Sequence, residues 1–178
     1  MRVASIDIGI NGCMAITDGT FNRPTLVDNL EPIIQQIPTL LKQEGVKIVV
    51  VEEPLYADVA HRFSGITKGF VTTWYNFGRL MQTLELVRPN LEIIRVQPKS
   101  WQAPIVEAMP RDKNGARKKW GKQDAADYLV AKYPATNGYV YNNKGKLIDG
   151  RSDALCIADW FFSGKLAEAD EIEQEVTE

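Results

Sequence analysis

Short apolar runs, separated by turns, open this chain. Residues 3–6 and 13–16 form two such runs, joined by a turn that contains Gly9 and Gly12. Apolar runs of this length, bounded by glycine, predict two buried strands joined tightly as an antiparallel hairpin. A third short strand is predicted over 25–29.

Helical and strand patterns alternate after the hairpin. Apolar positions predict a helix over 30–44 that Asn29 caps, with a kink or a late start at Pro38. The β-branched run 48–51 predicts a strand covered on both faces. Further along, the pattern predicts a helix over 68–86 interrupted at Gly78, a strand over 91–96, a helical turn around Trp101 and a helix over 122–132. It then predicts a hairpin or extended loop over 138–148 that turns at 143–145, and a final amphipathic helix within 149–162. The residues of this helix expected to face inward are Ala154, Leu155, Ile157, Ala158 and Phe161.

This alternation predicts an α/β protein with three layers, in which helices flank a mixed central sheet. We expect one domain over 1–167, followed by a flexible acidic tail over 168–178. No apolar run approaches the roughly 20 residues that cross a bilayer, and Asp7 interrupts any signal-peptide pattern, so we expect a cytoplasmic protein. Cys13 and Cys156 lie in apolar strings, which favours buried thiols over a disulfide.

The formal charge of −2 conceals an uneven distribution. The tail holds six acidic residues and no basic one, whereas the preceding 167 residues hold 21 basic and 17 acidic ones. Residues 111–122, the basic segment, contain six basic residues against one acidic residue. This segment is either a solvated surface loop or a contact for a polyanion.

Several kinds of site are excluded. One histidine, His61, and two cysteines in apolar strings do not build a tetrahedral zinc site. No glycine-flanked nucleophile accompanies His61, and the chain lacks a P-loop and the full dinucleotide fingerprint.

Carboxylates at the ends of predicted elements remain. Asp7 ends the first strand and Glu52 ends the strand that begins at residue 48, so parallel neighbouring strands would place them side by side. Asp149 and Asp153 share a helix face. Clustered acids repel unless a cation neutralises them, and oxygen ligands favour Mg²⁺ or Mn²⁺. The alternatives are structural: Asp7 caps its turn, Asp149 caps a helix, and Glu53 takes the inward position instead of Glu52.

The motifs IDIG, VVVEEP and DGRSDALCIADW together resemble RuvC-type Holliday junction resolvases, which have the ribonuclease H-like fold. YNFGRLMQTLE is similar to the glycine-containing helix of their dimer interface. VQPKSWQ and RKKWGKQDAADYLVAKYP resemble their proline-led turn, basic loop and following helix. The resemblance covers nearly the whole chain except the tail, and its compact length looks closer to phage and viral members, which would place the protein in the host cytoplasm.

The resemblance implies a homodimeric, metal-dependent endonuclease that resolves four-way or branched DNA by paired nicks, leaving 5′-phosphate and 3′-hydroxyl ends. It implies Asp7, Glu52 and Asp153 as catalytic ligands of two Mg²⁺ ions, for which Mn²⁺ would substitute. The family's fourth ligand falls on Gly150 here, so either Asp149 serves through a one-residue shift or three carboxylates suffice. The expected DNA contacts are Arg117, Lys118, Lys119 and Lys122.

Two other functions are compatible with parts of the sequence. An actin-like ATPase or sugar kinase also has a phosphate-binding hairpin after an aspartate, but it needs two such domains around a nucleotide. A non-catalytic DNA-binding module would keep the basic segment without needing the acids.

Overall fold

A mixed five-stranded sheet forms the centre of the computed structural model, which describes residues 1–54, 68–111, 115, 120–148 and 150–175. The spatial order is β3-β2-β1-β4-β5. β1 pairs antiparallel with β2, and β2 pairs antiparallel with β3, whereas β4 and β5 continue parallel to β1. The strands are β1 (Val3–Asp7), β2 (Cys13–Thr17), β3 (Thr25–Asp28), β4 (Ile48–Glu52) and β5 (Glu92–Val96).

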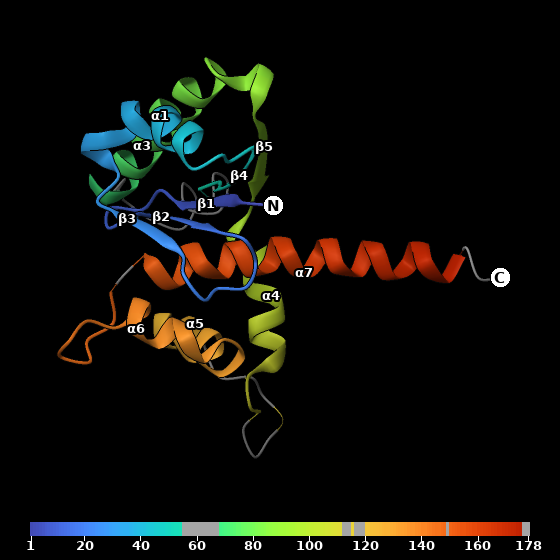
Figure 1. The fold of residues 1–178 in the computed structure, drawn as a ribbon. Coiled ribbons are helices and arrows are strands. Elements are labelled where there is room, and N and C mark those ends of the chain that lie inside the picture. Colours follow the sequence, from blue (N-terminus) through green and yellow to red (C-terminus); the bar gives the residue numbers. More distant parts are fainter. Residues whose placement is uncertain (55–67, 112–114, 116–119, 149, 176–178) are drawn as a thin grey trace.

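Helices cover both faces of the sheet, which confirms the predicted three-layer α/β architecture (Figure 1). One face carries a 3₁₀ helix (Glu31–Gln36), α1 (Ile37–Gln43) and α3 (Lys68–Glu85). The other carries α4 (Pro98–Ala108), α5 (Lys122–Lys132), α6 (Asn137–Val140) and α7 (Arg151–Glu175). Short 3₁₀ turns, Arg88–Asn90 and Pro134–Thr136, connect some of these elements.

Alternation along the strands divides the buried side chains into two cores. Ala4 and Ile6 of β1 pack in the core beneath α1 and α3, and Val3 packs in the core beneath α5 and α7. Cys13 and Cys156 are buried free thiols, as predicted. The final helix buries the five residues expected to face inward, Ala154, Leu155, Ile157, Ala158 and Phe161.

Three local predictions need correction. The helix predicted over 30–44 is a 3₁₀ helix followed by α1, because Pro38 lies at the start of α1; Asn29 has a left-handed φ of 54° and does not cap it. α3 runs through Gly78 without interruption. The segment predicted as a hairpin or extended loop over 138–148 begins within helix α6, and its remainder is a loop that turns at 143–145, with one bridge between Tyr141 and Leu147.

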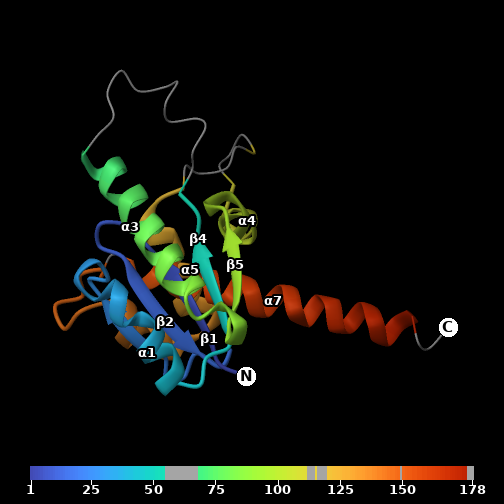
Figure 2. The ribbon, with the colours of Figure 1, turned by 90° about the horizontal axis from the view of Figure 1, so that it is seen from above.

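α7 is the longest helix of the described chain. Its first turns lie against the sheet, and its C-terminal part extends beyond the other elements (Figures 1 and 2). His61 lies outside the described residues. No described helix combines the length and apolar character needed to cross a membrane.

Candidate active site

The parallel pairing of β1 and β4 brings two carboxylates to one edge of the sheet. Ile6 is opposite Val51 in this register, so Asp7 and Glu52, the next residues, end neighbouring strands together. Both side chains are half-buried. The sequence prediction that these two acids lie side by side is therefore confirmed as a property of the fold.

α7 adds a third carboxylate from the layer below the sheet. Asp153 lies in the first turn of this helix, where the partial positive charge of the helix N-terminus favours an acid. The buried Ser5 hydroxyl of β1 donates to the Ala154 carbonyl at 2.6 Å. This bond fixes the start of α7 against β1, two residues before Asp7.

The turn after Asp7 depends on its carboxylate and on a glycine. The Gly9 amide donates to Asp7 Oδ1 at 2.9 Å. One carboxylate oxygen of Asp7 therefore caps the turn, which is the structural role considered for this residue. A Cβ on Gly12 would lie 2.4 Å from the Asp7 carbonyl oxygen, a steric clash, so this backbone requires glycine at position 12. Asp7 Oδ2 lies on the side of Gly150, 3.4 Å from where a Cβ of that residue would stand.

Gly150 closes the site from the α7 side. Its φ is +84°, and a Cβ there would lie 2.3 Å from the carbonyl oxygen of Asn11 in the β1–β2 turn. A ligating side chain at position 150 therefore does not fit this backbone. Asp149, the alternative fourth ligand, lies outside the described residues.

Glu52 carries the clearest electrostatic signature. Burial raises its pKa to about 8, and the charges of Asp7 and Asp153 contribute in the same direction, while a hydrogen bond from Trp101 lowers it. The carboxylates are thus close enough to repel one another. Glu53 does not take the inward position, because it lies 3.9 Å from Arg95 in a partly exposed ion pair.

The chemistry of this donor set fits a divalent cation. The charges of Asp7 and Asp153 both act on Glu52, and two nearby arginines, Arg95 and Arg151, form ion pairs with Glu53 and Asp28. Across the described ranges, no three His, Cys, Asp or Glu side chains already form a group able to hold a metal ion. The carboxylates would have to close further around a cation, with oxygen ligands that suit Mg²⁺.

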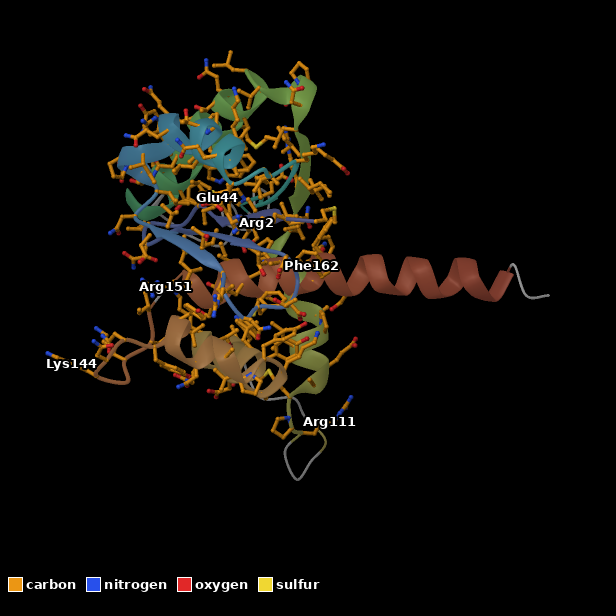
Figure 3. All side chains as sticks on the ribbon, in the orientation of Figure 1. Arg2, Glu44, Arg111, Lys144, Arg151 and Phe162 are labelled. Carbon is orange, nitrogen blue, oxygen red and sulfur yellow. The ribbon has the colours of Figure 1, made fainter. Side chains whose placement is uncertain are left out.

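Arg151, the first residue of α7, is fixed by the edge strand. Figure 3 labels Arg151 at the start of α7. Its guanidinium donates to both oxygens of Asp28 at 2.6–3.1 Å and to the Tyr139 carbonyl at 3.0 Å. The pair holds the pKa of Asp28 below its usual range. Since Arg151 lies two residues before Asp153, the contact anchors the helix end that presents Asp153.

Most of the predicted DNA contacts lie beyond the described chain. Arg117, Lys118 and Lys119 are outside it, whereas Lys122 is exposed at the first position of α5. Arg111 lies exposed after α4, where its guanidinium donates to the Gly115 carbonyl at 3.2 Å (Figure 3).

Sequence reasoning missed the residues that support the acids. Trp101 donates from Nε1 to Glu52 Oε2 at 2.7 Å, and Arg151 is held by Asp28. A further buried acid, Asp159, accepts hydrogen bonds from Tyr128, Lys132 and Tyr133 and so joins α5 to α7. The sequence placed Trp101 about one helical turn after a predicted strand end. That position fits a residue of the site and a residue of the core equally well, so it did not identify Trp101.

Replacing Glu52 by Gln tests the repulsion. The pKa of Glu52 is raised from 4.5 to about 8 in the fold, so its favourable contribution to stability is complete below pH 4.5 and is lost as pH rises through 8. In chelator, Glu52→Gln should therefore raise Tm relative to wild type at about pH 9 more than at about pH 5. Glu53→Gln is the control. An equal effect of Glu52→Gln at both pH values would contradict the buried, repelled carboxylate.

Removing the Asp28 charge tests the anchor of α7. Asp28→Asn should lower the free energy of unfolding by about 1.5–3 kcal/mol, the range for hydrogen bonds to charged groups, in urea titrations at neutral pH. Glu44→Gln, which removes the partner of the more exposed Arg2 on the other helical layer, should cost less than about 1 kcal/mol. Equal losses in the two variants would show that the Asp28 contact is only an ordinary surface pair.

Comparison with known proteins identifies the fold. No family model matches the chain, and no curated protein matches it in sequence. The structure of Thermus thermophilus RuvC in complex with a Holliday junction substrate matches with a TM-score of 0.57 at 15% identity, over 94% of this chain and 96% of RuvC. The yeast mitochondrial Holliday junction resolvase Ydc2 matches with a TM-score of 0.59 at 14% identity, over 89% and 76%. The chain thus has the ribonuclease H-like fold of RuvC-type resolvases, as its motifs predicted.

Proposed function

We propose that this protein is a metal-dependent endonuclease that resolves four-way or branched DNA by paired nicks. The observation that carries the proposal is the convergence of Asp7, Glu52 and Asp153 from two parallel strand ends and a helix N-terminus. Solved proteins of the same fold are Holliday junction resolvases, and one of them is bound to its junction.

The three carboxylates would hold up to two Mg²⁺ ions, with Asp149 as the proposed fourth ligand and Mn²⁺ as a substitute. When bound, such ions activate a water for in-line attack on phosphorus and stabilise the leaving 3′ oxygen, so the ends would be 5′ phosphate and 3′ hydroxyl. The protein's own contribution is to hold the acids in place: the Gly9 amide orients Asp7, Trp101 orients Glu52, and the Ser5 bond seats the turn that bears Asp153.

The backbone around the acids would admit the phosphate. Gly9, Gly12 and Gly150 keep side chains off the surface between the β1–β2 turn and α7. Arg117, Lys118, Lys119 and Lys122 are proposed to neutralise flanking phosphates, because phosphate contacts supply most of the affinity of proteins for DNA.

A homodimer is proposed to place two such sites on the two strands that must be cut. α3 supports this choice, because its outer face exposes Val71 and Tyr75 at 53% and 63%. They lie one helical turn apart, and Gly78 lies on the same face one turn further along. A Cβ at Gly78 would meet no atom of the described chain within 4 Å. A second copy of the chain covering this face would remove the exposed apolar side chains from water.

Cleavage of a synthetic four-way junction tests the catalytic assignment. Asp7→Asn and Asp153→Asn should each reduce Mg²⁺-dependent nicking by more than about 100-fold, while junction binding persists. Loss of a residue that only supports a metal ligand typically reduces activity by about 10–100-fold, so a larger loss indicates a ligand. Asp127→Asn, on the exposed side of α5, is the control. Cleavage that survives both substitutions would refute the site, and turnover of Mg·ATP without nicking would favour the actin-like alternative.

Light scattering tests the dimer. Wild-type protein should have twice the chain mass of 20.0 kDa, and Val71→Glu should shift it to the monomer, because a charge would be buried between the helices. Ile10→Glu, which changes an equally exposed apolar side chain in the β1–β2 turn, should leave the mass unchanged. A monomeric wild type, both free and on the junction, would contradict the proposal.

A further inference from the structure

Glu52 receives a hydrogen bond from a buried indole. Trp101 Nε1–H donates to Glu52 Oε2 at 2.7 Å, and within the described chain it is the only hydrogen bond to this carboxylate. Trp101 itself is 2% exposed. A buried indole N–H needs an acceptor, and here the acceptor is a carboxylate of the candidate site.

The fold supplies this contact through strand register and a short connection. Glu52 is opposite Val96 at the end of β5, and the Glu53 amide donates to the Val96 carbonyl at 2.8 Å. Gln97 is extended, and Pro98 begins α4 immediately afterwards, which places Trp101 in the first turn of that helix. A side chain in this turn lies directly beside the end of β4.

The Trp101 ring has little freedom to move. It packs edge-to-face with Trp120 at a centroid distance of 6.0 Å, within a core that also contains Ile105 and Cys156. Trp120 lies two residues before α5, whose start is fixed by the hydrogen bond from the Gly121 amide to Asp124 at 2.8 Å. The donor that faces Glu52 is therefore held by two helices.

The chemistry of the donor suits a carboxylate that must stay available to a cation. An arginine or lysine at this position would neutralise Glu52 and compete with a metal ion. An indole N–H donates one hydrogen bond and carries no charge, so it restrains the carboxylate and leaves its negative charge in the site. Groups that restrain a metal ligand in this way commonly change metal affinity 10–100-fold when they are removed.

We propose that Trp101 is the positioning residue of Glu52: it holds Oε2 and leaves Oε1 for a cation shared with Asp7 and Asp153. The inference rests on the proposed metal-dependent function, but the hydrogen bond between Trp101 and Glu52 is already present in the protein. Trp101 acts only through Glu52. It needs no contact with DNA.

Substitution of Trp101 by Phe tests the role, because Phe keeps an aromatic ring and loses the N–H. Mn²⁺ binding to the full-length protein, followed by the electron paramagnetic resonance of the free ion, should weaken by about 10–100-fold in Trp101→Phe. Trp160→Phe is the matched control, since Trp160 packs against the same core from α7. It should bind Mn²⁺ within about twofold of wild type and should lose a comparable amount of Tm.

Kinetics and spectroscopy separate positioning from packing. On the junction, Trp101→Phe should lower kcat and raise the Mg²⁺ concentration for half-maximal rate, with KM for DNA unchanged. In ¹⁵N spectra the four tryptophans give four indole signals. The signal that is lost in Trp101→Phe should shift on Glu52→Gln and on addition of Mg²⁺ to wild type. If Trp101→Phe does not fold, single substitutions of the other three tryptophans assign that signal by elimination.

Equal Mn²⁺ affinity in the Trp101 and Trp160 variants would overturn the positioning role. A Trp101 indole signal whose chemical shift does not change on Glu52→Gln would also overturn it. The two proposals fail separately. A wild type that cuts no junction but loses Mn²⁺ affinity on Trp101→Phe would refute the nuclease and support the role of Trp101.

Discussion

Repulsion among Asp7, Glu52 and Asp153 is the constraint on which the arrangement of this end of the molecule depends. Parallel pairing of β1 with β4 forces the first two acids together, and α7 brings the third from a different layer. Burial is the larger cause of the raised pKa of Glu52, at about 8, and the charges of Asp7 and Asp153 raise it further. Such an arrangement lowers the stability of the cation-free fold, and a bound divalent cation would reverse that loss.

Three of the hydrogen bonds described around the acids share one property: their donors are uncharged groups. Asp7 is held by a backbone amide, Glu52 by an indole, and the α7 turn by a serine hydroxyl. The nearest arginine on α7, Arg151, is turned to Asp28 instead, so its charge serves to anchor the helix. The fold thus restrains the geometry of the three acids while it preserves their affinity for a cation.

Much of the fold was predictable because its signals are local. The apolar runs around Asp7 and before Glu52 indicated buried strands, and α5 begins and ends at the predicted residues, 122 and 132. Glu52 was preferred to Glu53 because it ends the predicted strand and because the family resemblance implies it, and Glu53 lies near Arg95 instead. Long-range contacts were not predictable: the Asp28–Arg151 pair joins residues 123 positions apart, and Trp101 reaches Glu52 only through the register of β4 and β5. Gly150 was noted as a departure from the family pattern, but its positive φ and its close approach to the Asn11 carbonyl could not be read from the sequence.

The most direct measurement of the central claim is a crystal structure of the wild-type protein soaked in Mn²⁺, with anomalous data collected at the manganese edge. The account predicts an anomalous peak bounded by the carboxylates of Asp7, Glu52 and Asp153, with Trp101 still hydrogen-bonded to Glu52. Manganese bound only elsewhere on the protein, with these three carboxylates left apart, would contradict it.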